Sequence, residues 1–190
     1  MTTIILALVI GAAFGFVLDR VGATNPGYII GMLNLKNLHL MKTIVLAIGV
    51  ASVLTFTGLL IGIIDPGHLS VKAAYIGVFV GGILLGVGFA ISGYCPGTGL
   101  TAAATGRKDA MFFALGGLLG AAAYMGSYAW VETTGLLDKI MGGDSTLGTI
   151  AGTTYPALIE GVSGEWVGIV LGIALIVIAS VLPARLIPAK

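Results

Sequence analysis

The sequence predicts an all-α polytopic membrane protein with about five transmembrane helices and two re-entrant half-helices. Of the 190 residues, 9% are charged, 57% are hydrophobic and 31 are glycine, whereas about 25% of a soluble domain is charged. A chain this apolar has too few polar side chains to cover a water-facing surface. This composition excludes an ordinary soluble domain, a disordered tail and a coiled coil.

Five apolar stretches without any charged side chain account for the predicted spans. Each has close to the ~20 residues that a helix needs to cross a hydrocarbon core of ~30 Å. They are residues 2–18, 43–64, 73–92, 110–131 and 166–182. We interpret the first as a retained helix rather than a signal peptide, because no basic region precedes it and no small-residue cleavage site precedes Asp19.

We expect a single transmembrane domain over residues 1–190, embedded in the lipid bilayer. Residues 132–165 carry five acidic residues and form the longest predicted non-spanning segment, which we place outside the cell. Residues 166–182 then form the last helix.

The basic residues predict the orientation. Positive side chains accumulate in the cytoplasmic loops of membrane proteins. Seven of the nine lysines and arginines fall on one side of the predicted spans: Arg20, Lys36, Lys42, Arg107, Lys108, Arg185 and Lys190. The N-terminus is therefore expected outside and the C-terminus in the cytoplasm. Residues 107–109 fit an ordinary positive-inside stop, or alternatively an electropositive vestibule that concentrates anions.

The uncharged stretch of residues 73–106 is too long for one span, and Pro96 lies where it should break. Proline cannot continue a helix through its nitrogen and forces the preceding residue out of the helical region. We expect a helix to end near Ser92 and a half-helix to begin at Pro96 with Cys95 at its cap. That leaves three backbone N–H groups free, those of Gly97, Thr98 and Gly99.

Unpaired backbone at membrane depth is tolerated only inside protein or beside a wet cavity. Helix N-termini bind anions, and interrupted helices that point at an anionic substrate recur in transporters. This predicts a substrate-binding region made of Cys95, Pro96, Gly97, Thr98, Gly99 and Thr101. The alternative is a proline kink beside a buried, inert cysteine.

A second break lies 70 residues earlier, at Asn25, Pro26 and Gly27. The apolar run that follows, residues 28–35, is too short to span, and we predict a second re-entrant half-helix there. Asn25 and Gly27 join the candidate binding residues. The two breaks suggest a weak internal repeat of residues 2–64 and 73–131, of the kind many transporters show. An ordinary Pro-Gly turn is the other reading.

The sequence shows no pattern typical of disulfide bonding, metal binding, nucleic-acid binding or catalysis. The single cysteine excludes a disulfide framework and a cysteine-rich metal site. Basic and acidic residues nearly cancel, so nothing predicts nucleic-acid binding. We find no Ser/His/Asp set or metal-ligand spacing, and expect neither an enzyme nor a cofactor. GxxxG pairs in every predicted span, such as Gly168 with Gly172, indicate close helix packing.

Three segments together resemble the YeeE/YedE sulphur-transport family, which includes thiosulfate transporters. They are residues 93–98 (GYCPGT), residues 106–110 (GRKDA) with the glycine-rich helix after them, and residues 25–27 (NPG) with Gly31 and Leu33. The resemblance covers most of residues 11–125. It implies a short, single-lobe, multi-pass protein of the prokaryotic cytoplasmic (inner) membrane that transports thiosulfate or a related sulfur-containing anion.

In that family, motif cysteines along a central path interact with the sulfur end of the substrate. Only Cys95 matches them here, and Asn25 stands in the N-terminal box. Because the chain departs from the family here, we expect a homodimer, or a second membrane lobe, to supply a second cysteine; the alternative is a different substrate, such as another sulfur or selenium species. An alternative is a membrane persulfide or redox carrier that hands sulfur from Cys95 to a soluble sulfurtransferase. A membrane scaffold in which Cys95 is only packed is the third possibility.

Overall fold

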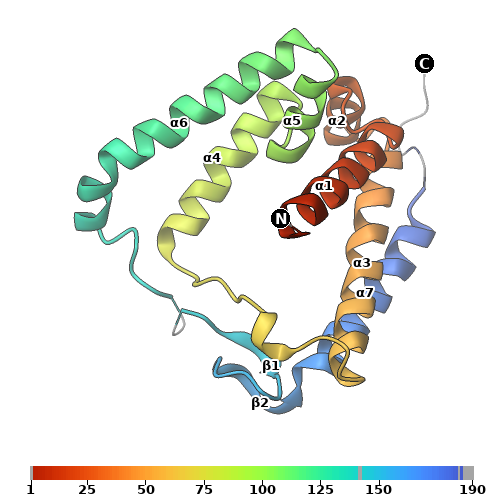
Figure 1. Cartoon of the computed structure of the whole chain (residues 1–190), viewed down its shortest axis with the longest axis vertical. Coiled ribbons are helices and arrows are strands. Elements are labelled where there is room, and N and C mark those ends of the chain that lie inside the picture. The colour runs from red at the N-terminus through yellow and green to blue at the C-terminus, as the bar shows by residue number, and fades with distance from the viewer. Residues whose placement is uncertain (1, 141–142, 184, 186–190) are drawn as a thin grey trace. The chain divides into compact units, whose positions relative to one another are not determined.

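The structure is a computed structural model, and it describes all residues except 1, 141–142, 184 and 186–190 (Figure 1). Lys190, which the orientation argument counted, lies outside the described residues. Helices dominate the chain. The elements are α1 (Thr2–Arg20), α2 (Pro26–Leu33), α3 (His39–Leu60), η1 (Pro66–His68), α4 (Ile76–Ser92), α5 (Pro96–Ala104), α6 (Lys108–Thr133), β1 (Thr146–Thr149), β2 (Ala157–Ser163) and α7 (Gly164–Val181).

Among the described residues, five stretches of helix are long and apolar enough to cross a membrane. They are Thr2–Arg20, His39–Leu60, Ile76–Ala104, Lys108–Thr133 and Gly164–Val181. These helices fit the predicted multi-pass membrane protein. The third stretch contains both α4 and α5, which are separated by a break after Ser92.

Two of the predicted bounds shift for local reasons. α3 ends at Leu60 rather than at residue 64, because Gly62 takes a left-handed φ of 72° and the N–H groups of Ile63 and Ile64 turn back to the Gly58 carbonyl. α4 begins at Ile76 rather than at residue 73, because Ala74 bonds to Ile140 and Gly143 through its backbone and Tyr75 forms a bridge with Lys139.

The chain divides into two compact units. The first comprises residues 1–40, 83–129 and 183–190, and we call it the short-helix unit because it holds α2 and α5. The second comprises residues 41–82 and 130–182, and we call it the strand unit. α4 and α6 each continue from one unit into the other.

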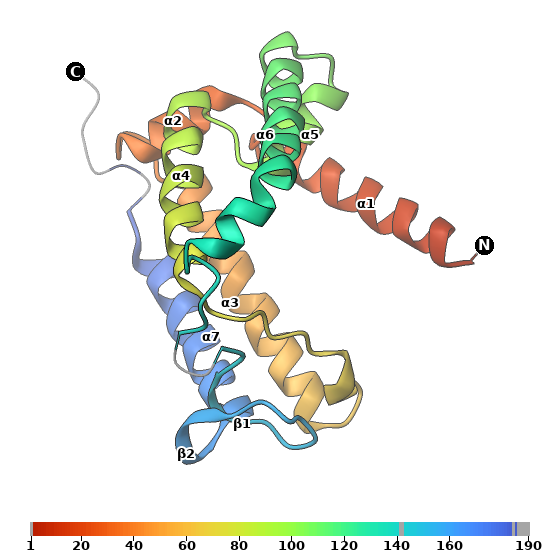
Figure 2. The same cartoon turned by 90° about the vertical axis from the view of Figure 1, so that its left-hand side faces the viewer.

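The core of the short-helix unit lies where α5 packs on α6. Tyr94, Ala102 and Ala110 are buried there, with Ala103 and Phe113 packed against them. α1 contacts α5 where Gly15 meets the Thr101 methyl group, and no residue of α1 is buried. Figure 2 shows α1 running out from the α5–α6 pair.

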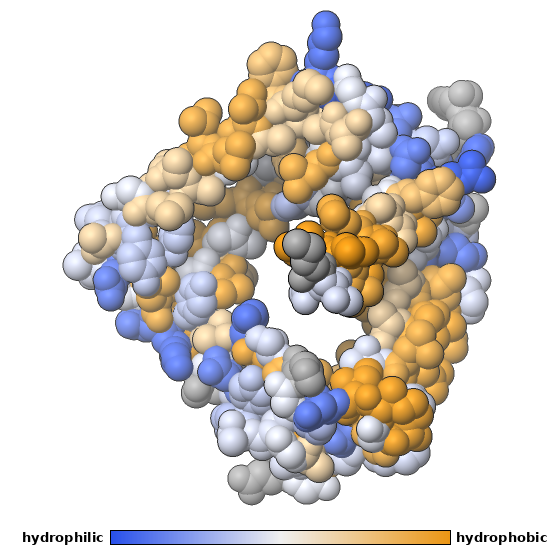
Figure 3. All heavy atoms as spheres, in the orientation of Figure 1, coloured by the Kyte–Doolittle hydropathy of each residue, from blue (hydrophilic) through white to orange (hydrophobic). Residues whose placement is uncertain are grey.

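The exposed surface of the helices is largely apolar, as a lipid-facing surface should be. Figure 3 shows hydrophobic residues, in orange, over α1 and α3. On α1 the large side chains from Ile4 to Val17 are all more than half exposed. Such a surface would cause aggregation in water, but it is the surface expected of helices that face the hydrocarbon of a membrane.

In the strand unit, α3 and α7 pack through small residues. Gly168 lies against the Phe56 ring, and Gly172 lies against the Gly49 carbonyl and Val53. The Ser52 hydroxyl donates to the Gly168 carbonyl at 2.9 Å. The Gly168 and Gly172 pair therefore provides the close helix contact that its spacing predicted. By contrast, Gly81 on α4 and Gly116 and Gly120 on α6 face no described atom within 4 Å of where a Cβ would lie.

Residues 132–165 form more than a loop, because they contain β1 and β2. The two strands pair in parallel, with Thr146 opposite Ala157 and Gly148 opposite Ile159. The buried Glu165 ties this segment to the start of α7, since its carboxylate accepts from the Ala151 N–H at 3.3 Å and the Ser163 hydroxyl at 2.7 Å. The sequence analysis predicted no strands here.

Candidate functional site

The break before α5 lies where proline chemistry predicts it. α4 ends at Ser92, and Gly93 then takes a left-handed φ of 69°, a conformation that glycine adopts without steric cost. Cys95 is the N-cap with extended backbone, and Pro96 is the first residue of the helix. The Cys95 side chain is half-buried. The structure therefore separates α5 from α4 as a helix of its own.

Cys95 and Thr98 cap each other. The Thr98 N–H donates to the Cys95 sulfur at 3.4 Å, and the Cys95 N–H donates to the Thr98 hydroxyl oxygen at 3.0 Å. The hydroxyl proton has two acceptors in reach, the Cys95 sulfur at 3.2 Å and the Cys95 carbonyl at 3.3 Å. This is a capping box in which a thiol replaces the usual Ser or Thr hydroxyl.

The first turn of α5 keeps fewer free donors than expected. The Thr98 N–H is taken by the Cys95 sulfur, and the Gly99 N–H donates to the Cys95 carbonyl at 2.8 Å. Among the described residues, the exposed Gly97 N–H is the one donor of this turn without an acceptor. The expectation of three free N–H groups is therefore wrong for two of them, because the cap and the first helical bond satisfy them.

The other candidates on α5 are Pro96 and Gly97, which are exposed, and Thr101 and Gly99. The Thr101 hydroxyl donates to the Gly97 carbonyl at 3.2 Å and the Thr98 carbonyl at 3.0 Å. Gly99 is buried, and a Cβ there would collide with the Phe113 ring of α6. The absence of a side chain at Gly99 thus sets how closely α5 approaches α6.

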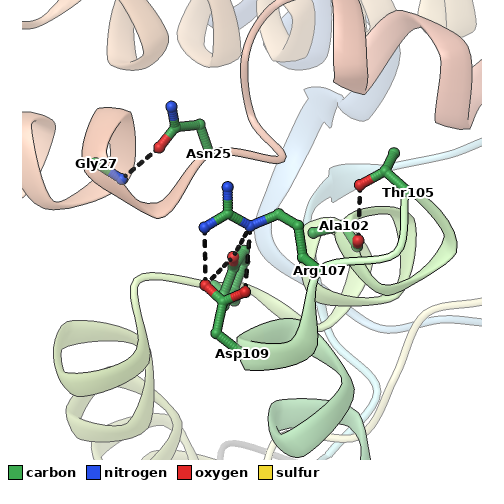
Figure 4. A network of polar contacts seen from close by, with 7 residues as sticks. Asn25, Gly27, Ala102, Thr105, Arg107 and Asp109 are labelled. Carbon is green, nitrogen blue, oxygen red and sulfur yellow. Dashed lines mark hydrogen bonds and ion pairs between the residues drawn. The ribbon is translucent and has the colours of Figure 1, made fainter.

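Asn25 occupies the position in α2 that Cys95 occupies in α5. Asn25 is the N-cap, its side-chain oxygen accepts from the Gly27 N–H at 2.9 Å, and Pro26 is the first helical residue (Figure 4). Asn25 and Gly27 are exposed. An anion at this helix start would therefore meet a neutral amide rather than a thiol.

The two short helices also end alike. A left-handed residue follows each C-cap: Leu35 with φ 57° after Asn34, and Gly106 with φ 86° after Thr105. The next N–H then bonds to the carbonyl five residues earlier, from Lys36 to Gly31 and from Arg107 to Ala102. This is the Schellman pattern of helix termination.

The two breaks meet in space. Gly93, two residues before Cys95, is buried, and a Cβ there would lie 2.9 Å from the Pro26 side chain and 3.2 Å from that of Ile30. Pro26 and Ile30 belong to α2. The candidate residues at positions 25–27 and 95–99 therefore lie on neighbouring parts of the short-helix unit.

Tyr94, Arg107 and Asp109 form a polar cluster that joins the segment before α5 to the segment after it. The Tyr94 hydroxyl donates to Asp109 Oδ2 at 2.8 Å and accepts from Arg107 Nε at 2.9 Å. Arg107 also donates to both carboxylate oxygens of Asp109, from Nε at 3.2 Å and from Nη2 at 2.9 Å. Figure 4 shows the Arg107 and Asp109 side chains pointing toward one another.

This cluster was not predicted from the sequence. Residues 107–109 were interpreted as a positive-inside stop or a vestibule, and Tyr94 was given no role. The available signal was the run of Arg107, Lys108 and Asp109, which are the first charges after the uncharged residues 73–106. The hydrogen bonds that Arg107 donates to Asp109 and Tyr94 raise the pKa of Arg107 above its usual range. Arg107 is thus a fixed partner in the cluster and remains positively charged.

A cavity of about 610 Å³ lies beside α5. Its walls come from α4, α5 and α6 and include Leu84, Phe89, Tyr94, Pro96, Phe113 and Leu118. The lining is almost wholly apolar. An anion placed there would lose its hydration without gaining a partner, so the polar side of the α5 N-terminus fits an anion better.

The comparison with known families agrees with this arrangement. A family model described as "Sulphur transport" matches residues 24–188. The chain belongs to the sulphur transport family. The match confirms the resemblance seen at positions 25–27 and 93–110, and it extends through the part after residue 125, where the motifs gave little support. Searches of curated proteins and of solved structures give no match.

Both short helices, with their caps, lie inside the matched segment of this sulphur transport family member, whereas the whole of α1 precedes it. The region that the family model covers thus contains Asn25, Cys95 and the cluster of Tyr94, Arg107 and Asp109.

Proposed function

We propose that this protein carries thiosulfate, or a related sulfur-containing anion, across the prokaryotic cytoplasmic (inner) membrane, with the substrate passing Cys95. The proposal makes it a transporter and not an enzyme. The observation that carries it is the capped thiol of Cys95 at the start of α5, inside an apolar stretch of a chain from the sulphur transport family.

The hydrogen bonds of Cys95 support a contact with the sulfur end of such an anion. Because the sulfur accepts from the Thr98 N–H and lies in reach of its hydroxyl proton, the S–H proton is left to point elsewhere. The terminal sulfur of thiosulfate would accept a hydrogen bond from the Cys95 S–H group. Its oxygens would face the helix N-terminus, where the Gly97 N–H is available. Neutral donors hold an anion weakly enough to release it.

The short helices support a re-entrant arrangement. α2 has 8 residues and α5 has 9, which makes them about 12 and 14 Å long at ~1.5 Å per residue, against ~30 Å of hydrocarbon. We propose that both enter the membrane from the cytoplasmic side, with the N-terminus of the chain outside and the C-terminus inside. Their matching caps support an internal repeat of residues 2–64 and 73–131.

A homodimer, or a second membrane lobe, completes the proposal. One chain supplies one thiol, and it leaves exposed the large apolar side chains of α1 and, beside the α5 cavity, those of Leu84, Leu100 and Leu118. A second copy would supply a second thiol and cover part of that surface.

The test is thiosulfate uptake into proteoliposomes of the purified protein. Wild type is compared with Cys95→Ala, which removes the sulfur, and with Cys95→Ser, which keeps a capping oxygen. We expect uptake by the wild type and at least a tenfold loss in both variants, about 1.4 kcal/mol of lost stabilisation. Full uptake by folded Cys95→Ala would remove Cys95 from the mechanism. No uptake by folded wild type would reject thiosulfate as the cargo.

A further inference from the structure

The Tyr94 side chain lies in the core of the short-helix unit with Ala102 of α5 and Ala110 of α6. Tyr94 is 2% exposed, and its ring lies 5.8 Å from that of Phe113, centroid to centroid. Its hydroxyl is the shared vertex of the cluster, since it bonds to Asp109 and Arg107 at the same time. The hydroxyl of this buried residue has a fixed direction, because breaking either contact removes one of its two charged partners.

This cluster connects to Cys95 through the backbone. Tyr94 is the residue directly before Cys95, and its own N–H donates to the Ser92 hydroxyl at 3.2 Å. Both ends of Tyr94 are therefore held, at Ser92 on one side and at Asp109 on the other. The extended backbone of Cys95 continues from this anchored residue.

Arg107 and Asp109 anchor the other end of α5. Arg107 follows the last turn of α5, where its N–H bonds to the Ala102 carbonyl, and Asp109 lies in the first turn of α6. The cluster thus connects Tyr94, which precedes the cap of α5, to the loop after α5 and to the first turn of α6. α5 is held at both ends by one set of hydrogen bonds.

We propose that Tyr94, Arg107 and Asp109 are positioning residues for the Cys95 thiol, and that the Tyr94 hydroxyl fixes the place of the sulfur in the anion path. The inference rests on the proposed function for its transport consequence, but the position of the sulfur is measurable without transport. Arg107 acts here through Asp109 and Tyr94 rather than by contact with the substrate.

The experiment compares Tyr94→Phe with Tyr128→Phe, a matched loss of one tyrosine hydroxyl on α6, where Tyr128 packs edge-on against Tyr124 away from the cluster. Cys95 is the only cysteine in the chain, so maleimide labelling reports it alone. Labelling rates are measured in proteoliposomes with and without thiosulfate, beside uptake at several thiosulfate concentrations. Asp109→Asn and Asp109→Glu test the second vertex.

We expect Tyr94→Phe to change the labelling rate of Cys95 by about fivefold, the factor that one lost hydrogen bond produces. Protection by thiosulfate should weaken, and KM should rise more than the maximal rate falls. Asp109→Glu should recover part of the wild-type behaviour, and Tyr128→Phe should match wild type. A purely structural role would lower the melting temperature and leave KM and protection unchanged, which would overturn the inference.

The two proposals fail in different ways. If wild type shows neither uptake nor protection, the proposed function fails, and the labelling rates of Tyr94→Phe and Tyr128→Phe still decide the positioning role. If wild type transports and depends on Cys95 while Tyr94→Phe labels, binds and transports like Tyr128→Phe, the positioning role is rejected and the transport proposal stands.

Discussion

The N–H of Cys95 and the hydroxyl of Thr98 form a hydrogen bond of 3.0 Å that is matched by a bond of 3.4 Å from the Thr98 N–H to the Cys95 sulfur. The two residues therefore fix one another's side chains at the start of α5. The sulfur takes part in the fold as well as in the proposed chemistry.

Thr98→Val should weaken this cap. Valine keeps the β-branched shape but removes the hydroxyl, so the Cys95 N–H loses its acceptor. We expect a loss of about 1–2 kcal/mol of stability, the usual cost of a lost cap, and a several-fold change in Cys95 labelling. Thermal unfolding in detergent measures the first. Thr98→Ser should restore the wild-type value, and Thr105→Val, at the far end of α5, should leave the labelling unchanged.

Gly99→Ala should disturb the contact between α5 and α6. A Cβ at Gly99 would collide with the Phe113 ring, and overpacking of this kind costs about 1–3 kcal/mol. A lower melting temperature is the expected readout. The control is Gly116→Ala, where a Cβ has no described neighbour within 4 Å. Gly99→Ala combined with Phe113→Leu should recover stability, and failure of that rescue would count against the contact.

Asn25→Asp should separate folding from transport. Aspartate caps a helix as well as asparagine does, so α2 should remain formed. Its negative charge would repel an anion near the exposed Asn25 position, and we expect uptake to fall at least tenfold, about 1.4 kcal/mol. Asn25→Ser keeps a neutral cap and should transport. Equal uptake by the aspartate and serine variants would place the anion path away from α2.

Gly172→Ala should loosen the pair of α3 and α7. A Cβ at Gly172 would lie 2.8 Å from Val53 and 2.9 Å from the Gly49 carbonyl, so the helices would have to move apart. The expected cost is about 1–3 kcal/mol, read as a drop in melting temperature. Gly81→Ala is the control, because that position is open. Equal melting temperatures for the two variants would contradict the packing described for this unit.

Local rules predicted the parts of the fold that depend on neighbouring residues. Pro96 and Pro26 begin helices where their chemistry requires, and Cys95 and Asn25 are the caps. The five apolar spans follow from length and composition, which depend on no partner. Positions such as Leu60, where α3 ends, needed the left-handed Gly62, which the hydropathy pattern does not report.

Contacts between distant residues were not predictable in the same way. The hydrogen bond from Tyr94 to Asp109 joins residues 15 apart, and it depends on the packing of α5 against α6. The free N–H groups were miscounted because the sequence shows the thiol of Cys95 but not the direction in which it points. β1 and β2 were missed because a short strand pair depends on pairing across the chain rather than on a local pattern.

Gly93 limits which residues can occupy the contact between the segment before α5 and helix α2. Its left-handed backbone excludes most side chains, and the contact with Pro26 and Ile30 leaves no space for even a methyl group. Two independent constraints thus fall on one position, and relieving either alone would not admit another residue. Any substitution there would disturb the helix starts of α2 and α5 together, which couples these two distant stretches of sequence.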